Sequence, residues 1–336
     1  MRHTRAVQRD RTKRPLSAPS DEQLTARLTE VIHPATLDLV RYYHQLGLRE
    51  RLLTLPVMVA LVLSLIWRQF SGVSEVVRVI RTDTRLWVPP LQKLSQQALD
   101  QRLRTLPAVL FLRLLCHLLP VFQSRWQARQ RPVPAVIAWA HPSYSRLLIC
   151  DGSTLDALIR KVGLLRELTT HPLAGRMTAL LDLATRLPWK LWYEPDPNAN
   201  DQRGWPQLLA ALPAGALLLF DLGYTNFTVF LQLTQARVTF ITRAKSNLAY
   251  QLETALQRRD PVHDLLVWIG RGADRQPVRL IEVLYHGVWY RYLTNELDPQ
   301  RLPVEYVVAE FGKLFWPISA LSFGPPDQGN HHQVSR

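Results

Sequence analysis

The sequence predicts an α/β protein in which an all-helical region precedes a mixed α/β domain with a β-rich insertion. Three observations support this prediction. From Asp21 to about Gln130, apolar residues recur three and four positions apart, which is the spacing of one helix face. After Pro132, short apolar and β-branched runs alternate with helical segments. From Ser246 to Pro303, aromatic and β-branched residues predominate.

These changes of texture divide the 336 residues into five segments. We expect a basic, disordered arm at 1–20, a helical region at 21–131, an α/β core at 132–245, a β-rich insertion at 246–303 and an aberrant tail at 304–336. The length and the apolar content of 47% are sufficient for a sizeable core.

The charge of the chain points to a polyanionic partner. Its 41 lysines and arginines exceed its 27 acidic residues, which gives a net charge of +14, and most of the 41 are arginines. The guanidinium fork suits phosphate oxygens, and neutralised phosphates release counterions, so nucleic acid is the favoured partner. A merely basic, soluble protein is the alternative. The arm up to Pro15 lacks an apolar stretch, and the two cysteines show no disulfide spacing, so we expect a cytoplasmic protein without a secretory signal.

One apolar stretch in the helical region raises the question of a membrane. Residues Leu52 to Trp67 are nearly free of polar groups and include Pro56 near their start. A membrane-spanning helix needs about 20 apolar residues, which is more than this stretch offers. We therefore expect a buried helix and no membrane, with a membrane span as the less favoured alternative.

A second helix of this region is a candidate for contact with DNA. It begins near Ser95, a residue suited to capping a helix, and carries Arg102 and Arg104 close to three glutamines. Such residues contact phosphates and base edges when a helix enters a groove of DNA. A solvated helix face accounts for them equally well.

The α/β core begins after Pro132 and Pro134. Segments 205–212 and 225–235 have helical character, and we expect the apolar runs around them to be strands buried on both faces of a sheet. These runs are 146–151, 177–184, 189–194, 216–221 and 238–243. No glycine-rich phosphate loop follows any of them, so a dinucleotide-binding or P-loop fold has no support.

The insertion is expected to start with a helix and to continue as strands. The helix is predicted at 248–259, where leucine, glutamate, alanine and arginine predominate. Strands are predicted at 262–270, 278–287 and 288–296, with Gly287 in a hairpin turn.

Two of the predicted core strands end in an aspartate that a glycine follows within two residues. Asp151 precedes Gly152, and Asp221 is followed by Leu222 and Gly223. A carboxylate at the end of a buried strand is costly unless it is solvated, paired or bound to a cation, and glycine lets backbone or ligand approach closely. If the two strands are neighbours, the aspartates could hold two Mg²⁺ ions about 4 Å apart for phosphoryl transfer. Alternatively, each aspartate could begin a turn or cap a helix.

Four blocks of the chain, in order, resemble the DDE transposases of bacterial insertion sequences. The blocks are HPLAGRMTALLDLAT (171–185), LLLFDLGY (217–224), FITRAKSN (240–247) and YRYLTNELDP (290–299). The resemblance covers about residues 30 to 309. It is to the subgroup in which an RNase H-like catalytic fold is interrupted by a β-strand insertion, so it implies a mixed sheet of that kind here.

For this chain the resemblance implies a transposase that binds the terminal inverted repeats of its element and target DNA, as a homodimer, in the bacterial nucleoid. Asp151 and Asp221 match the first two catalytic acids of the family, which bind Mg²⁺ or Mn²⁺. In such enzymes an activated water and then a freed 3′-hydroxyl attack phosphodiesters in line. The resemblance also assigns 21–131 to DNA binding. Arg243 and Lys245 follow a predicted strand and could contact the DNA backbone, although a solvated strand end is an equal alternative.

The chain departs from the family at the third catalytic acid. The family has Tyr, two residues, Arg, three residues, Glu, six residues and Lys on one helix. Continuing the match places four unsuitable residues there, namely Phe311, Leu314, Ile318 and Pro325. The only nearby acid is Glu310, and the prolines that follow it interrupt any long helix.

Two interpretations of this departure remain. A shifted reading frame or an interrupted gene after Ala309 would have removed the third acid, or Glu310 serves as the third ligand. The resulting functions are an impaired transposase or a catalytically inactive DNA-binding remnant. An unrelated α/β nuclease with coincidental aspartates is a more distant alternative.

Overall fold

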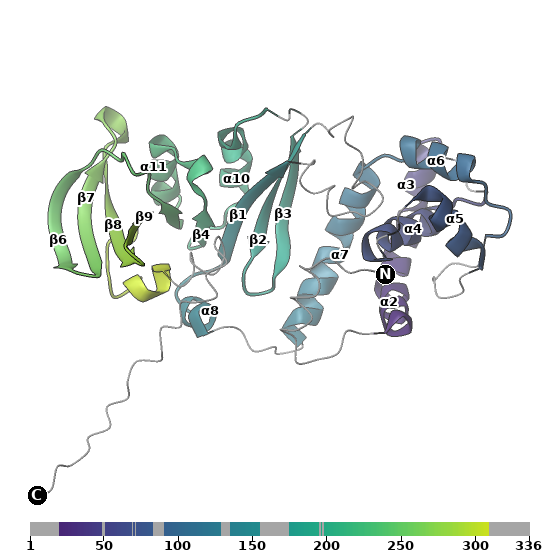
Figure 1. Cartoon of the computed structure of the whole chain (residues 1–336), viewed down its shortest axis with the longest axis horizontal. Coiled ribbons are helices and arrows are strands. Elements are labelled where there is room, and N and C mark those ends of the chain that lie inside the picture. Colours follow the sequence, from purple (N-terminus) through teal and green to yellow (C-terminus); the bar gives the residue numbers. More distant parts are fainter. Residues whose placement is uncertain are drawn as a thin grey trace, which may run out of the picture. The chain divides into compact units, whose positions relative to one another are not determined.

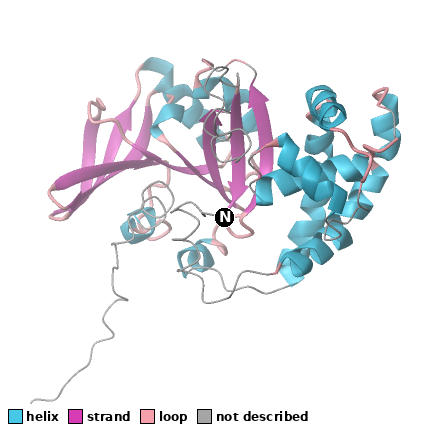
Figure 2. Cartoon of the chain, turned by 45° about the vertical axis from the view of Figure 1, so that its right-hand side comes forward, coloured by secondary structure: helices cyan, strands magenta, loops and turns pink. Residues whose placement is uncertain are grey.

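A computed structural model describes residues 20–48, 51–68, 70, 72–82, 91–128, 135–154, 175–194, 196 and 198–308. Two compact units are present, one with the described residues up to Arg125 and the other with those from Trp126 onward. The first unit consists of helices in its described part, and the strands belong to the second (Figures 1 and 2). The predicted basic arm up to residue 19 and Glu310 lie outside the described residues, whereas Ser20, the last residue of that arm, caps α2.

The first unit confirms the prediction of helices between 21 and 130. Its elements are α2 (Asp21–Asp38), α3 (Val40–Gln45), α4 (Leu55–Arg68), α5 (Val73–Thr82), α6 (Gln96–Thr105) and α7 (Val109–Ala128). Ser20 and Gln23 form a reciprocal capping box at the start of α2. The Ser95 side chain accepts a hydrogen bond from the Ala98 backbone N–H, as expected for the cap of α6.

The apolar stretch from Leu52 forms α4, which is a core helix of this unit. Met58 and Leu61 of α4 are almost inaccessible and share a hydrophobic cluster with Val76 and Ile80 of α5. Within the described residues, no single helix has the length and apolar character of a membrane span. Only α6 and α7 taken together pass that test, as a pair bent by 74°. Burial among neighbouring helices accounts for the composition of α4.

The second unit is organised around one nine-stranded mixed sheet (Figure 1). The strands are β1 (Leu147–Thr154), β2 (Arg176–Asp182), β3 (Leu187–Glu194), β4 (Leu217–Phe220), β5 (Thr239–Arg243), β6 (Gln251–Arg259), β7 (Val262–Ile269), β8 (Gln276–Tyr285) and β9 (Val288–Thr294). Their order is β3-β2-β1-β4-β5-β9-β8-β7-β6. β1, β4 and β5 are parallel, and the other pairs are antiparallel. The first five strands have the expected RNase H-like arrangement.

Helices cover both faces of the central strands. Along β4, Leu218 and Phe220 face one hydrophobic cluster, to which α10 (Trp205–Ala211) and α11 (Phe227–Gln235) contribute. Leu217 and Leu219 face the other cluster, to which α8 (Ala135–Ala140) contributes. The alternation of side chains in a strand therefore explains why all four residues are apolar, as the sequence predicted for a strand buried on both faces.

The predicted helix at 248–259 is wrong, because residues Gln251–Arg259 form strand β6. The local composition favours a helix, but pairing with β7 decides the structure. Leu252 lies opposite Val267 and Ala255 lies opposite Leu265 in this pairing. β6 is the edge strand of the sheet, and each of its residues is exposed. Tertiary hydrogen bonding therefore overrides the intrinsic preference of these residues.

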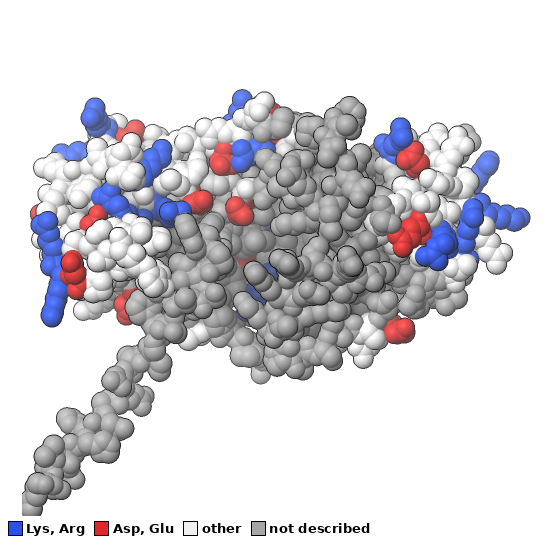
Figure 3. Space-filling view, viewed as in Figure 1, with Lys and Arg blue, Asp and Glu red and all other residues white. Residues whose placement is uncertain are grey.

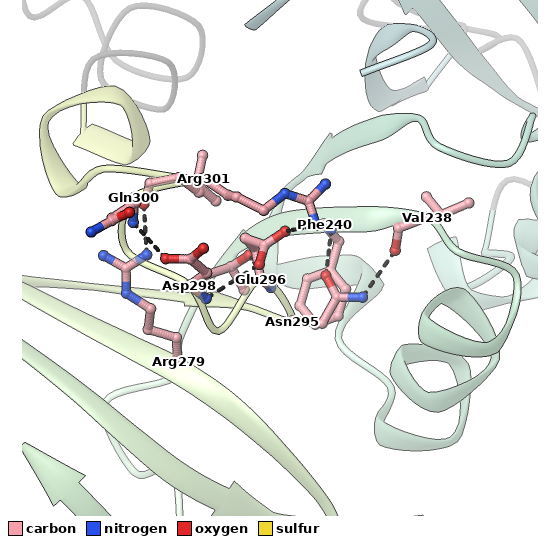
Figure 4. Close-up of polar contacts among 10 residues, drawn as sticks. Val238, Phe240, Arg279, Asn295, Glu296, Asp298, Gln300 and Arg301 are labelled. Atoms are coloured by element: carbon pink, nitrogen blue, oxygen red, sulfur yellow. Dashed lines mark hydrogen bonds and ion pairs between the residues drawn. The ribbon is translucent and has the colours of Figure 1, made fainter. Parts of the chain in front are cut away.

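The segment that follows β9 is fastened to the start of β5 (Figure 4). The Asn295 carboxamide accepts a hydrogen bond from the Phe240 backbone N–H at 2.8 Å and donates to the Val238 carbonyl at 2.9 Å. The chain then turns and is helical at 304–308, where Val307 and Val308 are buried in the core. The first residues of the predicted tail therefore belong to the packed domain.

A buried ion pair joins the insertion to this same segment. Arg279 of β8 is fully buried, and its guanidinium group makes two hydrogen bonds of 2.6 Å with the carboxylate of Asp264 on β7. A third, also 2.6 Å, runs from Arg279 to the carbonyl of Leu302. Arg279 therefore connects β7, β8 and the segment that follows β9.

Candidate active site

The two candidate aspartates lie at the same edge of the sheet on neighbouring strands. β1 and β4 are parallel, and Cys150 is paired with Phe220 in their register. Asp221 is the residue that follows β4, whereas Asp151 lies within β1, which pairs with β2 as far as Thr154 and does not end at the aspartate as predicted. Neighbouring strands are about 4.8 Å apart. The condition that these two strands are neighbours is therefore met.

The side chain of Asp221 does not serve the turn that it begins. Asp221 precedes the short helix η3 (Leu222–Tyr224), yet it makes no capping hydrogen bond to that helix. Its Oδ1 atom is buried and has no hydrogen-bond partner among the described residues. A desolvated carboxylate oxygen without a partner is unfavourable for folding. Such an oxygen is suited to a cation or to another ligand of the folded protein.

The turn-forming alternative applies instead to another aspartate, Asp182. It ends β2, and its Oδ1 atom accepts hydrogen bonds from the backbone N–H groups of Ala184 at 2.9 Å and Thr185 at 3.1 Å. Its Oδ2 atom pairs with Arg146 at 2.9 Å. Asp182 is thus an aspartate with a structural role at the end of a strand. Asp221 differs from it because its side chain does not cap the following turn and its Oδ1 atom accepts no hydrogen bond from the described residues.

Two side chains of this site, Asp221 and Asp151, have the oxygen atoms that a divalent cation requires. Asp221 offers the buried oxygen, and the neighbouring Asp151 is exposed and therefore accessible to a substrate. Mg²⁺ and related cations are held by one or two carboxylates, with water and phosphate oxygens completing the shell. Among the described residues, no group of three or more histidine, cysteine or acidic side chains is arranged to hold a metal ion. The site as described is a pair of carboxylates.

A further acidic residue, Asp201, lies between the segments that follow the two aspartates. A Cβ atom added to Gly152 would meet the Asp201 Oδ1 atom at 3.2 Å and the Tyr224 hydroxyl at 2.9 Å. A Cβ atom added to Gly223 would meet the Asp201 Oδ2 atom at 2.5 Å. The two glycines were expected to admit backbone or ligand, and the group that approaches them is this carboxylate.

Asp201 is held in place from β2. The Arg176 guanidinium group pairs with the Asp201 carboxylate and also donates a hydrogen bond of 2.8 Å to the carbonyl of Ala199. Asp201 begins the short helix η2 (Asp201–Gly204), and Gln202 of that helix donates to the carbonyl of Thr225 at 3.1 Å. The loop before α10 is therefore fixed both to β2 and to the segment that follows Asp221. Asp201 was not among the residues that the sequence indicated as candidates.

A buried thiol lies beneath this cluster. The pKa of Cys150 is raised to about 12, chiefly by burial. The nearby Tyr224 hydroxyl acts in the opposite sense, and the negative charges of Asp151 and Asp201 contribute to the rise. Burial also raises the pKa of the Tyr224 hydroxyl above its usual range. Neither group carries a charge near neutral pH, so neither adds a charge next to the carboxylates.

Only one of the two thiols is expected to react in the native protein. The thiolate is the nucleophile, and Cys150 is both buried and protonated, whereas Cys116 on α7 is exposed. A thiol-reactive disulfide reagent at pH 8 should therefore modify one cysteine in the folded chain and both in guanidinium chloride. Peptide mapping should locate the native modification at Cys116, and equal labelling of Cys150 would contradict the structure of this site.

The candidate DNA-binding residues differ in their surroundings. Arg102 donates a hydrogen bond of 2.9 Å to the Tyr43 hydroxyl, whereas Arg104 is exposed and forms an ion pair with Asp100 on the same helix. Arg243 is half-buried at the end of β5. Lys245 is exposed and lines a shallow hollow together with Thr225, Phe227, Asn247 and Leu248. Arg104 and Lys245 are thus the most accessible of the four.

Comparison with known protein families identifies one segment of the chain. Residues 173–303 match the family model described as "Transposase DDE domain". No curated protein matches the chain. The matched segment contains Asp221 and Asp201 and runs from just before β2 to the end of the insertion. Asp151 and Glu310 lie on either side of it.

Proposed function

Residues 173–303 of this chain are a transposase DDE domain, and we propose that the protein cleaves and joins DNA at the ends of a bacterial insertion sequence. It would bind the terminal inverted repeats as a homodimer, in the bacterial cytoplasm and on the nucleoid. Asp151 and Asp221 would hold Mg²⁺ or Mn²⁺. The observation that carries this proposal is the buried Oδ1 atom of Asp221, for which the described part of the chain supplies no hydrogen-bond partner. Asp221 lies inside the matched segment, and the strand before it is paired with the strand of Asp151.

The two carboxylates differ in burial, and we assign them different roles on that basis. Asp221 follows a strand whose four residues are buried, so its position is fixed by the core. Asp151 is exposed on the neighbouring strand and can reach a DNA phosphate. A divalent cation bound there would polarise the phosphodiester and favour deprotonation of the attacking water or 3′-hydroxyl. The neutral Cys150 and Tyr224 beneath the carboxylates add no competing charge.

DNA is the substrate of a transposase, and the charge of this chain suits it. The net charge is +14, and Figure 3 shows lysine and arginine side chains over the insertion strands and over the helical unit. Arg104 and Lys245 are exposed, and we propose both as contacts to the DNA backbone, with Arg102 and Arg243 in supporting places. Contacts of this kind depend steeply on salt because they release counterions.

A second candidate function is that of a DNA-binding remnant without cleavage activity. The observation that favours it is the pair, rather than triad, of carboxylates in the described part of the site. Asp201 does not complete a triad, because Arg176 engages its carboxylate. In this case the protein would occupy transposon ends and compete with a complete transposase.

The two functions are separated by a cleavage assay with the full chain. The substrate is a labelled duplex that carries the end of the protein's own element, with a duplex of scrambled end sequence as the control. We expect strand cleavage at the element boundary in Mn²⁺ and none in EDTA. Specific binding in both conditions without cleavage would support the remnant, and binding to both duplexes with equal affinity would contradict recognition of the inverted repeats.

A further inference from the structure

We propose that Asp201, locked by Arg176, is a positioning residue that sets the spacing between the segments carrying Asp151 and Asp221. This inference rests on the proposed function, because it assigns Asp201 a role in shaping the carboxylate pair. Its basis is the wedge that the Asp201 carboxylate forms between the residues after the two aspartates.

The space around Gly152 and Gly223 supports this role. Gly152 and Gly223 both have ordinary backbone φ angles, so their backbone conformation does not require glycine. At Gly223 the group that requires glycine is the Asp201 carboxylate, which would lie 2.5 Å from a Cβ atom. At Gly152 the Tyr224 hydroxyl at 2.9 Å and the Asp201 carboxylate at 3.2 Å limit the space together. One oxygen faces each segment. The carboxylate therefore fills the space that separates the end of β1 from the turn after β4.

The Asp201 carboxylate is held rigidly by Arg176. Arg176 is the first residue of β2, and its backbone is paired with Thr154 of β1 on one side and Glu194 of β3 on the other. Its side chain holds both the Asp201 carboxylate and the Ala199 carbonyl. Arg176 and Asp201 are only about one quarter exposed, so solvent screens their pairing less than that of a surface pair. The sheet thus fixes Asp201, and Asp201 fixes the two segments.

The charge of Asp201 is compensated by Arg176, which also favours a positioning role. A further uncompensated negative charge beside Asp151 and Asp221 would repel the DNA phosphate. The positive charge of Arg176 balances Asp201, so the wedge occupies its space without adding net negative charge. A direct ligand would need a free oxygen directed at the cation, whereas one oxygen of Asp201 is paired with Arg176 and the other faces Gly223. Asp201 is therefore assigned to positioning.

The chain contains a matched control in the same loop. Asp196 and Arg203 form a second aspartate–arginine pair, at 2.9 Å, but this pair is exposed and is not among the groups that lie against the two glycines. Replacing Asp196 by asparagine removes a charge of the same kind a few residues away. It should leave the spacing of the aspartate segments unchanged.

The test measures Mn²⁺ binding to the full chain without DNA, from the electron paramagnetic resonance signal of free Mn²⁺. We expect Asp201→Ala to weaken binding by roughly tenfold or more, as removal of groups that orient metal ligands does. Asp201→Asn keeps the volume of the wedge and an acceptor for Arg176, so it should retain most of the affinity, and Asp196→Asn should retain all of it. Circular dichroism melting confirms that each variant is folded.

A double-mutant cycle links the effect to the wedge. Gly223→Ala should weaken Mn²⁺ binding when Asp201 is present, because the new methyl group meets its carboxylate. In the Asp201→Ala background the same change should have little further effect, since the clash is gone. Gly223→Ala and Asp201→Asn also keep the test decisive if Asp201→Ala does not fold.

The opposing outcomes are distinct. Equal losses in Asp201→Asn and Asp201→Ala would overturn the positioning role, because a direct ligand needs the charge rather than the volume. Unchanged binding in Asp201→Ala and Gly223→Ala would overturn it as well. A wild-type chain that binds no Mn²⁺ at all would overturn the proposed function itself.

Discussion

Replacing Asp221 by asparagine should lower the rate of DNA cleavage by roughly a hundredfold to ten-thousandfold and leave the protein folded. A catalytic metal ion contributes several kcal/mol of transition-state stabilisation, and each ~1.4 kcal/mol corresponds to a factor of ten in rate. The buried Oδ1 atom of Asp221 has no hydrogen-bond partner in the described structure, so a neutral amide removes an unfavourable buried charge. The free energy of unfolding should therefore stay the same or rise. Single-turnover cleavage in Mn²⁺ and urea denaturation measure the two effects.

Asp182→Asn is the matched control, because Asp182 also ends a strand. Its carboxylate caps the following turn and pairs with Arg146, so its loss should lower stability and leave the cleavage rate of the folded fraction unchanged. The two substitutions should therefore have opposite profiles. A loss of stability in Asp221→Asn with full cleavage activity would show that Asp221 is a structural residue like Asp182.

Replacing Arg279 by methionine should reduce the free energy of unfolding by about 3–5 kcal/mol, which is the usual effect of breaking a buried ion pair. Arg279 is fully buried and Asp264 is 3% exposed, so the substitution leaves an uncompensated carboxylate inside the protein. It also removes the hydrogen bond to the Leu302 carbonyl, which ties the segment after β9 to the insertion. Urea denaturation followed by tryptophan fluorescence measures the effect.

Two further variants identify the cause of that loss. Replacing Asp264 by leucine in the Arg279→Met background removes the orphaned charge and should restore much of the stability, because apolar residues can replace a buried pair. Arg203→Met breaks the exposed pair with Asp196 and should change stability by less than about 1 kcal/mol. If Arg279→Met were no less stable than Arg203→Met, the buried pair would not contribute as its geometry indicates.

The parts of the fold that the sequence predicted are those with a strong local signal. The four apolar residues of β4 can be recognised as a strand buried on both faces, and α4 as a core helix, because burial alone determines their composition. The sequence indicated Asp151 and Asp221 as candidates but left open whether their strands are neighbours, which the pairing of β1 with β4 shows. β6 could not be predicted in this way, because its residues favour a helix and only pairing with β7 makes them a strand.

Asp201 was not recognisable for a different reason. It lies in a polar loop without periodicity, and its contacts come from Arg176, Gly152 and Gly223, which are distant along the chain. The only trace in the sequence is the glycine after each of the two aspartates, and that pattern does not say which group fills the space. Glu310 lies outside the described residues, so its role as a third ligand stays a prediction.

The position of β9 makes the insertion an integral part of the domain rather than a removable module. β9 pairs with β5 on one side and β8 on the other, and the hydrophobic cluster that contains Phe230 and Phe240 of the core also contains Val267 and Leu280 of the insertion. Excising the insertion would uncover the edge of β5 and one side of that cluster. Because β9 joins β5 to β8 in one ladder, we expect the amides of β5 and β8 to exchange with solvent as one cooperative unit.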